Sequence, residues 1–228
     1  MPTVGDALRA VETLDNVSFF KIGLQLFITG GLPALLDELR ARPGARVFVD
    51  LKLPGDISNT IAAVIDFCVE RRVTFLTVSE SMPRRAIAAA KSTRDAKGSR
   101  EPELLTVPFV SSLDASDLPP GAGDVEAFIV ARARAALEAG CDGVIASGDA
   151  IRVCRAAFPQ TVIVSPGIRP AGSSHDDHKR LTTPSDAIAR GADYLVVGRP
   201  ILRDPDPRAA ARRVVDEIDA SLRSLATN

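Results

Sequence analysis

Short apolar runs alternate with longer segments of helical periodicity along almost the whole chain, and this alternation constrains the fold more than any other feature. Runs rich in Val, Ile and Phe predict seven strands, at residues 18–23, 46–52, 75–79, 104–109, 143–147, 162–167 and 194–199. The intervening text predicts helices, most clearly at residues 32–42, 57–72, 83–96, 125–140 and 207–225. Near-continuous apolar strands that alternate with helices indicate a parallel sheet covered by helices.

The domain organisation follows from the same alternation. No linker or low-complexity segment divides the 228 residues, and residues 113–124 are predicted to be a long loop between a strand and a helix. We therefore expect a single α/β domain over residues 1–228, either a closed barrel or an open doubly wound sheet. Residues 1–14 predict a loop and a helix, so a barrel of eight units would lack its opening strand.

Composition excludes some classes of partner. The chain carries 28 Lys and Arg against 29 Asp and Glu, a net charge of -1, which provides no broad positive field for a nucleic acid or an anionic membrane. The longest apolar stretch near the start is interrupted by Lys21 and Pro33, so no membrane span is predicted. The three cysteines, Cys68, Cys141 and Cys154, are widely spaced among apolar residues, which predicts buried thiols and a cytoplasmic location.

Charged residues gather where two predicted strands end. Side chains alternate along a strand, so Asp50 and Lys52 project to one side while Val49 and Leu51 project to the other. Lys21 ends the preceding strand, and barrel enzymes keep catalytic groups at the carboxyl ends of their strands. With Asp56 these residues predict an alternating charged array. Each has a simpler alternative, a surface ion pair or, for Asp56, the N-cap of a helix that begins near residue 57.

Glycine and arginine follow the last two predicted strands. Residues 165–172 contain Arg169 and residues 197–201 contain Arg199, a combination that indicates a phosphate site. Barrel enzymes often hold phosphate on the loops after strands 7 and 8, whereas these loops follow predicted strands 6 and 7, a second indication of a missing first strand. Turn glycines and surface ion pairs are the alternatives. The His-Asp-Asp-His run at residues 175–178 is a weak metal candidate because no regular element holds it, so no metal site is predicted.

Taken together, the motifs DLKLPGDISNT (50–60), SPGIRP (165–170), DHKR (177–180) and GADYLVVGRPI (191–201) resemble orotidine 5'-phosphate decarboxylase of the short bacterial or archaeal type. The resemblance covers nearly the whole chain. It implies a (β/α)8 TIM-type barrel that acts as a homodimer, needs neither metal nor organic cofactor, and decarboxylates orotidine 5'-monophosphate to UMP in pyrimidine biosynthesis.

The resemblance also implies residue roles. Lys52 would protonate C6 of the pyrimidine as CO2 leaves, and Asp50 would lie against the substrate carboxylate. Lys21 and Asp56 would complete the charged array, and Asp56 would reach into the partner subunit's site. Ile57 and Thr60 would also reach the partner's site, and Ser111 and Ser112 would contact the pyrimidine. The phosphate would be bound by residues of the last two loops, namely Pro166, Gly167, Arg169, His178, Gly198 and Arg199.

Three departures from the family pattern leave alternatives open. The family's opening strand, which ends in an aspartate that binds ribose, is missing ahead of Met1. Three residues, Leu53 to Gly55, separate Lys52 from Asp56 where the family has two, so either a bulge absorbs the extra residue or the array is broken at Asp56. His178 replaces a phosphate-binding glutamine. The alternatives are a Mg-dependent sugar-phosphate decarboxylase or synthase on the same barrel and an inactive phosphate-ligand-binding relative.

Overall fold

The computed structural model describes residues 3–170 and 182–227, and residue contacts divide the chain into two compact units. The first unit comprises Met1–Thr106 and Ala136–Asp142, and the second comprises Val107–Ala135 and Gly143–Asn228. The single domain expected over residues 1–228 stays a prediction. Within the described residues, no helix has both the length and the apolar character needed to cross a lipid bilayer.

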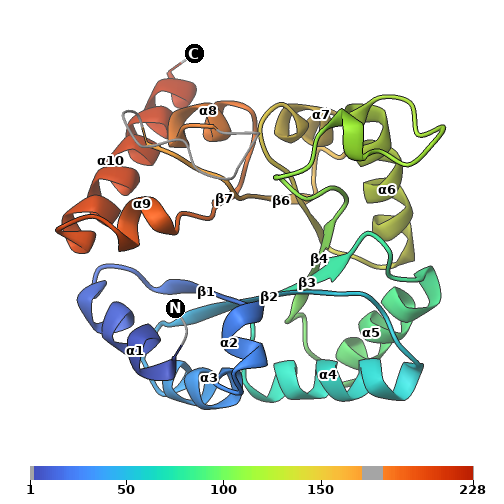
Figure 1. Cartoon of the computed structure of the whole chain (residues 1–228), viewed down its shortest axis with the longest axis horizontal. Coiled ribbons are helices and arrows are strands. Elements are labelled where there is room, and N and C mark those ends of the chain that lie inside the picture. Colours follow the sequence, from blue (N-terminus) through green and yellow to red (C-terminus); the bar gives the residue numbers. More distant parts are fainter. Residues whose placement is uncertain (1–2, 171–181, 228) are drawn as a thin grey trace. The chain divides into compact units, whose positions relative to one another are not determined.

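The first unit alternates helices and strands in chain order, from blue to green in Figure 1. Its strands are β1 (Phe19–Gly23), β2 (Arg46–Leu53), β3 (Phe75–Ser79) and β4 (Glu103–Val107), the last of which ends at the boundary of the unit. Its helices are α1 (Val4–Thr13), α2 (Leu24–Ile28), α3 (Leu32–Arg40), α4 (Ser58–Glu70) and α5 (Arg84–Ala96). Strands β1, β2 and β3 pair in parallel, with Lys21 opposite Phe48 and Phe48 opposite Phe75.

The second unit continues the same alternation. Its strands are β5 (Gly143–Ile145), β6 (Val162–Ser165) and β7 (Tyr194–Leu195), which pair in parallel in that order. Its helices are η1 (Ala115–Asp117), α6 (Val125–Ala139, whose last turn belongs to the first unit), α7 (Ala150–Ala157), α8 (Pro184–Ala189), α9 (Arg199–Leu202) and α10 (Pro207–Ala226). All seven predicted strands and all five clearest predicted helices are therefore present in the described part of the chain.

Some strands end earlier than the apolar runs predict. The run at residues 104–109 leaves the sheet at Val107, because Pro108 has no backbone N–H to donate to a neighbouring strand. The run at residues 194–199 ends at Leu195, because Gly198 becomes the N-cap of α9 and Arg199 its first residue. These shortened strands leave Pro108 and Gly198 in the loops that follow.

One face of β2 packs against the core of the first unit, and the other does not. Val47 and Val49 are buried in a cluster with Leu36 of α3, Ile65 of α4 and Leu76 of β3, and each such side chain stabilises the fold by about 1.5 to 3 kcal/mol relative to exposure. Helices α3 and α4 accordingly lie along one side of these strands (Figure 1). The alternate residues of β2 belong to the other face, as predicted for Asp50 and Lys52.

The cysteines are buried free thiols, as the sequence predicts. Burial raises the pKa of Cys68 and Cys141 to about 12 and that of Cys154 to about 11. All three are therefore protonated and unreactive at neutral pH.

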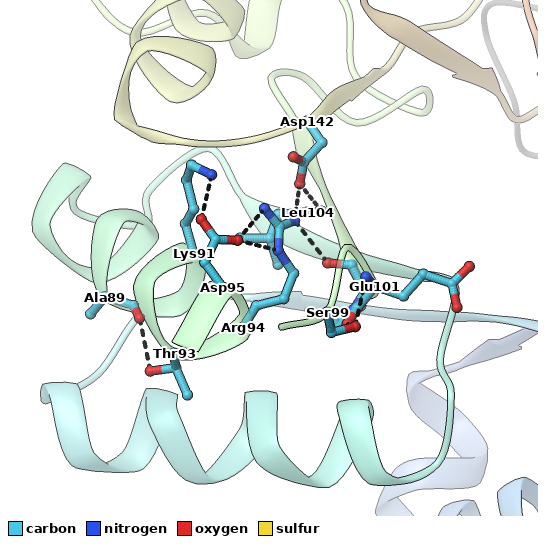
Figure 2. Close-up of polar contacts among 10 residues, drawn as sticks. Ala89, Lys91, Thr93, Arg94, Asp95, Ser99, Glu101, Leu104 and Asp142 are labelled. Carbon is cyan, nitrogen blue, oxygen red and sulfur yellow. Dashed lines mark hydrogen bonds and ion pairs between the residues drawn. The ribbon is translucent and has the colours of Figure 1, made fainter. Parts of the chain in front are cut away.

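A buried arginine ties together the elements around the start of β4. Arg94 of α5 is only 4% exposed, and its Nη1 donates to Asp142 Oδ2 at 2.5 Å and to the Pro102 carbonyl at 3.2 Å (Figure 2). The same Asp142 oxygen accepts the Leu104 N–H at 2.8 Å. One carboxylate thus joins α5, the beginning of β4 and the turn at residues 140–142.

The second unit repeats this arrangement with different residues. Arg155 of α7 donates to Asp193 Oδ2 at 2.6 Å, and the Ile163 N–H of β6 donates to the same oxygen at 2.7 Å. Each aspartate ends a Gly-x-Asp turn whose glycine has positive φ, 122° at Gly140 and 98° at Gly191. A Cβ at Gly191 would lie 2.8 Å from Cγ of Arg155, so this turn requires glycine.

We expect Asp142→Ala to lower the free energy of unfolding by about 3 kcal/mol, because it leaves the buried Arg94 charge and the Leu104 N–H without this carboxylate. Urea unfolding measures the loss. The matched control is Asp95→Ala, which removes the other carboxylate on Arg94 but at a side chain that is 46% exposed, and should cost about 1 kcal/mol or less. Equal losses in the two variants would contradict the stabilising role of the Asp142 carboxylate.

Candidate functional site

Three charged side chains from two neighbouring strands meet in the first unit. Asp50 of β2 accepts a hydrogen bond from Lys21 Nζ of β1 at Oδ2, at 2.7 Å, and one from Lys52 Nζ at Oδ1, at 2.8 Å. The register explains the meeting, since Lys21 lies opposite Phe48, and Gly23, which lies opposite Asp50, has no side chain to separate Lys21 from the carboxylate. The predicted Lys21–Asp50–Lys52 part of the array is thus present as two ion pairs on one carboxylate.

The carboxylate is the least accessible of the three groups. The Asp50 side chain is 15% exposed, whereas both lysines are more open to solvent. Burial raises the pKa of Asp50, but the charges and hydrogen bonds of Lys21 and Lys52 outweigh this, so that its pKa lies below the ordinary value. Asp50 is therefore an anion at neutral pH, held between two ammonium groups.

A bulge in β2 brings Lys52 to this position. The five residues Val49 to Leu53 of β2 run alongside only the three residues Leu76 to Val78 of β3. Lys52 has φ of 51°, the left-handed conformation that a residue other than glycine rarely adopts. The strand thereby bends at its carboxyl end, a common place for bulges beside active sites.

Thr77 of β3 is a site residue that the sequence reasoning missed. Its Oγ1 donates to Asp50 Oδ1 at 3.0 Å and accepts the backbone N–H of Lys52 at 2.8 Å. The only signal in the sequence was a polar residue within the apolar run FLTVS, and threonine is so common in strands that this signal is weak.

The Pro54-Gly55 link lies against the loop that follows β3. Gly55 has φ of 96°, and a Cβ on it would lie 2.6 Å from Cδ of Pro83 and 3.3 Å from Cγ of Met82. The irregular pairing of β2 thus lies ahead of this link, between Val49 and Leu53, and the link itself takes a conformation that needs glycine at residue 55.

The structure does not bring Asp56 into the charged cluster of the same chain. Among the described residues Asp56 has no ion pair, and its Oδ1 accepts the N–H of Ile57 at 2.7 Å. The alternative prediction, that Asp56 is the N-cap of the following helix, is wrong. Helix α4 begins at Ser58, so Ile57 occupies the N-cap position and offers no side-chain oxygen.

The remaining residues assigned to the partner's site are exposed. Ile57 is 70% exposed, unusual for a large apolar side chain, and Thr60 in the first turn of α4 is also exposed. Neither side chain is therefore committed to the core of its own unit.

In the second unit, the loops after β6 and β7 leave neighbouring strands, since Ser165 pairs with Leu195. After β6, Gly167 takes φ of 77° and the chain turns so that buried Arg169 bonds through its N–H to the Thr182 carbonyl at 3.0 Å. Its Nη1 donates to the Ile168 carbonyl at 2.9 Å. Arg169 is thus anchored close to the end of β6.

The loop after β7 carries the second predicted arginine. Gly198 caps α9, a Cβ on Gly198 would meet no atom within 4 Å, and the half-buried Arg199 is the first residue of the helix. Pro166 is likewise half-buried in the loop after β6. The structure therefore brings the predicted phosphate residues of the two loops to the same end of adjacent strands.

Other predicted contacts lie elsewhere. Ser111 is buried and Ser112 exposed in the loop after β4, within the second unit. His178 lies outside the described residues. Within residues 3–170 and 182–227 no three His, Cys, Asp or Glu side chains come together as a metal site would require.

Comparison with known proteins places these observations in a family. The family described as Orotidine 5'-phosphate decarboxylase / HUMPS matches residues 1–214. A relative from Ruegeria pomeroyi named orotidine 5'-phosphate decarboxylase is 41% identical over 225 residues, 96% of this chain and 90% of the relative. A protein of the same name from Rhodopseudomonas palustris (strain BisB5) is 44% identical over 223 residues, 96% of this chain and 91% of its own length.

Solved structures give the same picture at the level of fold. Orotidine 5'-phosphate decarboxylase from Lactobacillus acidophilus aligns with a TM-score of 0.79 and 27% identity, covering 96% of this chain and 95% of the other. The enzyme of that name from Pyrococcus horikoshii aligns with a TM-score of 0.73 at 24% identity, covering 96% of each chain, a likeness of fold alone. The predicted α/β class, a TIM-type barrel fold with seven strands among the described residues, is confirmed.

Asp50 should contribute to stability in a pH-dependent way. Because its pKa is lowered in the folded chain, ionised Asp50 stabilises the fold fully above its unfolded pKa of about 3.9, and this contribution is lost as the pH falls through the lower folded value. The free energy of unfolding of the parent, relative to that of Asp50→Asn, should therefore fall as the pH is lowered from about 5 to about 2. Urea unfolding at a series of pH values measures this difference, and one that stays constant would count against the charged cluster.

Proposed function

The chain belongs to the Orotidine 5'-phosphate decarboxylase / HUMPS family, and we propose that it decarboxylates orotidine 5'-monophosphate to UMP and CO2 in pyrimidine biosynthesis. The family description names a second group beside the decarboxylase, so the family match alone does not select the reaction. The relatives from Ruegeria and Rhodopseudomonas support the choice, since both bear the decarboxylase name and align over almost their whole length.

The observation that carries the proposal is the anionic Asp50 carboxylate held between the ammonium groups of Lys21 and Lys52. Decarboxylation breaks the bond between C6 and the carboxylate carbon, and its electron pair stays on C6 as CO2 leaves. An ammonium group beside C6 stabilises this negative charge as it develops. In the proposal Lys52 then transfers a proton to C6, which gives UMP, and regains a proton from solvent.

Asp50 has a different task in this scheme. Next to the substrate carboxylate, its negative charge opposes the substrate's own, and this repulsion disappears when neutral CO2 leaves. The two lysines lower the pKa of Asp50 and so keep its carboxylate ionised. Lys21 also fixes the orientation of the carboxylate through Oδ2, while Oδ1 accepts from Lys52 and Thr77.

The second unit supplies the residues proposed to bind the rest of the substrate. Arg169 and Arg199 carry the charge that suits a phosphate, and Gly167 and Gly198 leave room for close approach to the backbone. Ser111 and Ser112 are proposed to contact the pyrimidine, and Pro166 and His178 to complete the phosphate loop. Binding energy from the remote phosphate can then be used to hold the reacting carbon in place.

We also propose a homodimer in which Asp56, Ile57 and Thr60 enter the partner's site. The support within this chain is that Asp56 lies outside its own charged cluster while Ile57 exposes most of its apolar surface. In a symmetric dimer the same segment of each chain meets the other, so both sites would be completed in the same way.

Lys52→Ala should lower kcat/KM for orotidine 5'-monophosphate by about 10³-fold or more, because it removes both the proton donor and the charge next to C6. Loss of the substrate's ultraviolet absorbance follows the reaction. The matched control is Lys97→Ala, at an exposed lysine that pairs with Asp66 at 3.2 Å and should leave the rate unchanged.

Two results would contradict the assignment. An active Lys52→Ala protein would remove Lys52 from the proton-donating role. Loss of activity on addition of a chelator, with recovery on Mg²⁺, would favour the Mg-dependent sugar-phosphate enzymes of the same barrel type instead.

The dimer makes a separate prediction. Lys52→Ala and Asp56→Asn should each be nearly inactive alone, whereas a mixture exchanged to equilibrium should regain about a quarter of parent activity, because half of the dimers are mixed and one of their two sites is then intact. The assay is the same absorbance change after subunit exchange. No regain, in a mixture shown to contain mixed dimers, would mean that Asp56 acts within its own chain.

A further inference from the structure

Thr77 occupies the point where three strands of the first unit contribute to one carboxylate. Asp50 receives Lys21 from β1, Lys52 from within β2 and the Thr77 hydroxyl from β3. Thr77 is 1% exposed, so solvent has almost no access to its hydroxyl. This hydroxyl is therefore placed to act on the charged cluster alone.

The Thr77 hydroxyl donates one hydrogen bond and accepts another. As a donor it reaches Asp50 Oδ1 at 3.0 Å, and as an acceptor it receives the backbone N–H of Lys52 at 2.8 Å. A single hydroxyl can do both, since it has one hydrogen and two lone pairs. It thereby couples the side chain of Asp50 to the backbone of Lys52.

The backbone that Thr77 holds is a strained one. Lys52 has φ of 51° within the β2 bulge, a conformation that is unfavourable for a residue with a Cβ. In a regular parallel ladder the N–H of Lys52 would bond to a backbone carbonyl, whereas here its partner is a side chain. The direction in which Lys52 leaves the strand therefore depends on Thr77.

We propose that Thr77 is a positioning residue of the reaction, which sets where the Lys52 ammonium and the Asp50 carboxylate lie relative to each other. It touches neither substrate nor reacting atoms in this scheme and acts through these two groups. The inference rests on the proposed function, because the decarboxylation assigns Lys52 and Asp50 their tasks. Because Thr77 bonds to the Asp50 carboxylate and to the backbone of Lys52, it affects the distance between the two residues directly.

Removal of the hydroxyl without change of shape tests this role. Thr77→Val leaves the Lys52 N–H without its acceptor and Asp50 without one donor, so Lys52 can relax out of the left-handed conformation. We expect kcat to fall about 10- to 100-fold, since displacement of a catalytic group by about 1 Å has effects of that size. KM should change less than about threefold, because the residues proposed to bind the phosphate are untouched.

Two matched variants separate this role from general packing. Thr77→Ser keeps the hydroxyl and should retain kcat within about threefold of the parent. Thr74→Val makes the same change three residues earlier, at a residue that is 3% exposed and has no hydrogen bond to Asp50 or Lys52 in the described structure, and should leave kcat unchanged. A parent-like kcat in Thr77→Val, or an equal loss in Thr74→Val, would overturn the proposal.

A further variant tests the role of the Thr77 hydroxyl if Thr77→Val fails to fold. If Thr77→Val is unfolded by circular dichroism, Thr77→Cys takes its place, because cysteine has the same unbranched shape as serine but its larger sulfur is a weak donor and acceptor. Its kcat should then lie about tenfold below that of Thr77→Ser. Equal rates for the two would contradict the proposal.

A second readout distinguishes failure of this inference from failure of the proposed function. Activity of the parent enzyme on orotidine 5'-monophosphate tests the function itself. Independently, the ¹³C resonance of the Asp50 carboxyl reports its titration, and loss of the Thr77 donor should raise the pKa of Asp50 in Thr77→Val but not in Thr74→Val. An unchanged Asp50 titration in Thr77→Val would overturn the positioning role even if the parent proved inactive on this substrate.

Discussion

One carboxylate organises the candidate site, because Asp50 holds an ammonium group on each of its oxygens. A buried anion is costly unless it is paired and hydrogen-bonded, and here the two lysines outweigh the effect of burial on the pKa of Asp50 while Thr77 donates a further hydrogen bond. The same pairing restrains both lysines, whose flexible side chains would otherwise sample many conformations. Charge, orientation and local backbone shape in this part of the first unit therefore depend on each other.

The two ends of the strands carry different groups. The carboxyl ends of β1, β2 and β3 carry the charged cluster, with a bulge and a residue at positive φ. The Gly-x-Asp turns that precede β5 and β7 instead bind buried or half-buried arginines and the N–H groups of the second residues of β4 and β6. This agrees with the general division in barrel enzymes, where chemistry lies at one end and stability at the other.

How far the sequence could predict the site depends on the range of each interaction. The meeting of Lys21 with Asp50 was predictable, since neighbouring strands pair and side chains alternate. The role of Thr77 was not, because threonine in an apolar run is ordinary and its partners lie 25 and 27 residues away in the chain. The N-cap alternative for Asp56 rested on local pattern alone, and it is wrong because the helix begins at Ser58 with Ile57 at the N-cap.

By itself, the sequence determined the order of strands and helices, the side of β2 on which Asp50 and Lys52 project, and the family motifs, because these depend on periodicity and on neighbours along the chain. Only the tertiary structure decided that β2 bulges at Lys52, that Gly55 packs against Pro83, and that Thr77 links the two catalytic candidates. The reason is physical. A bulge is a compromise between two strands and the loops beyond them, so its position follows from packing that no local pattern encodes.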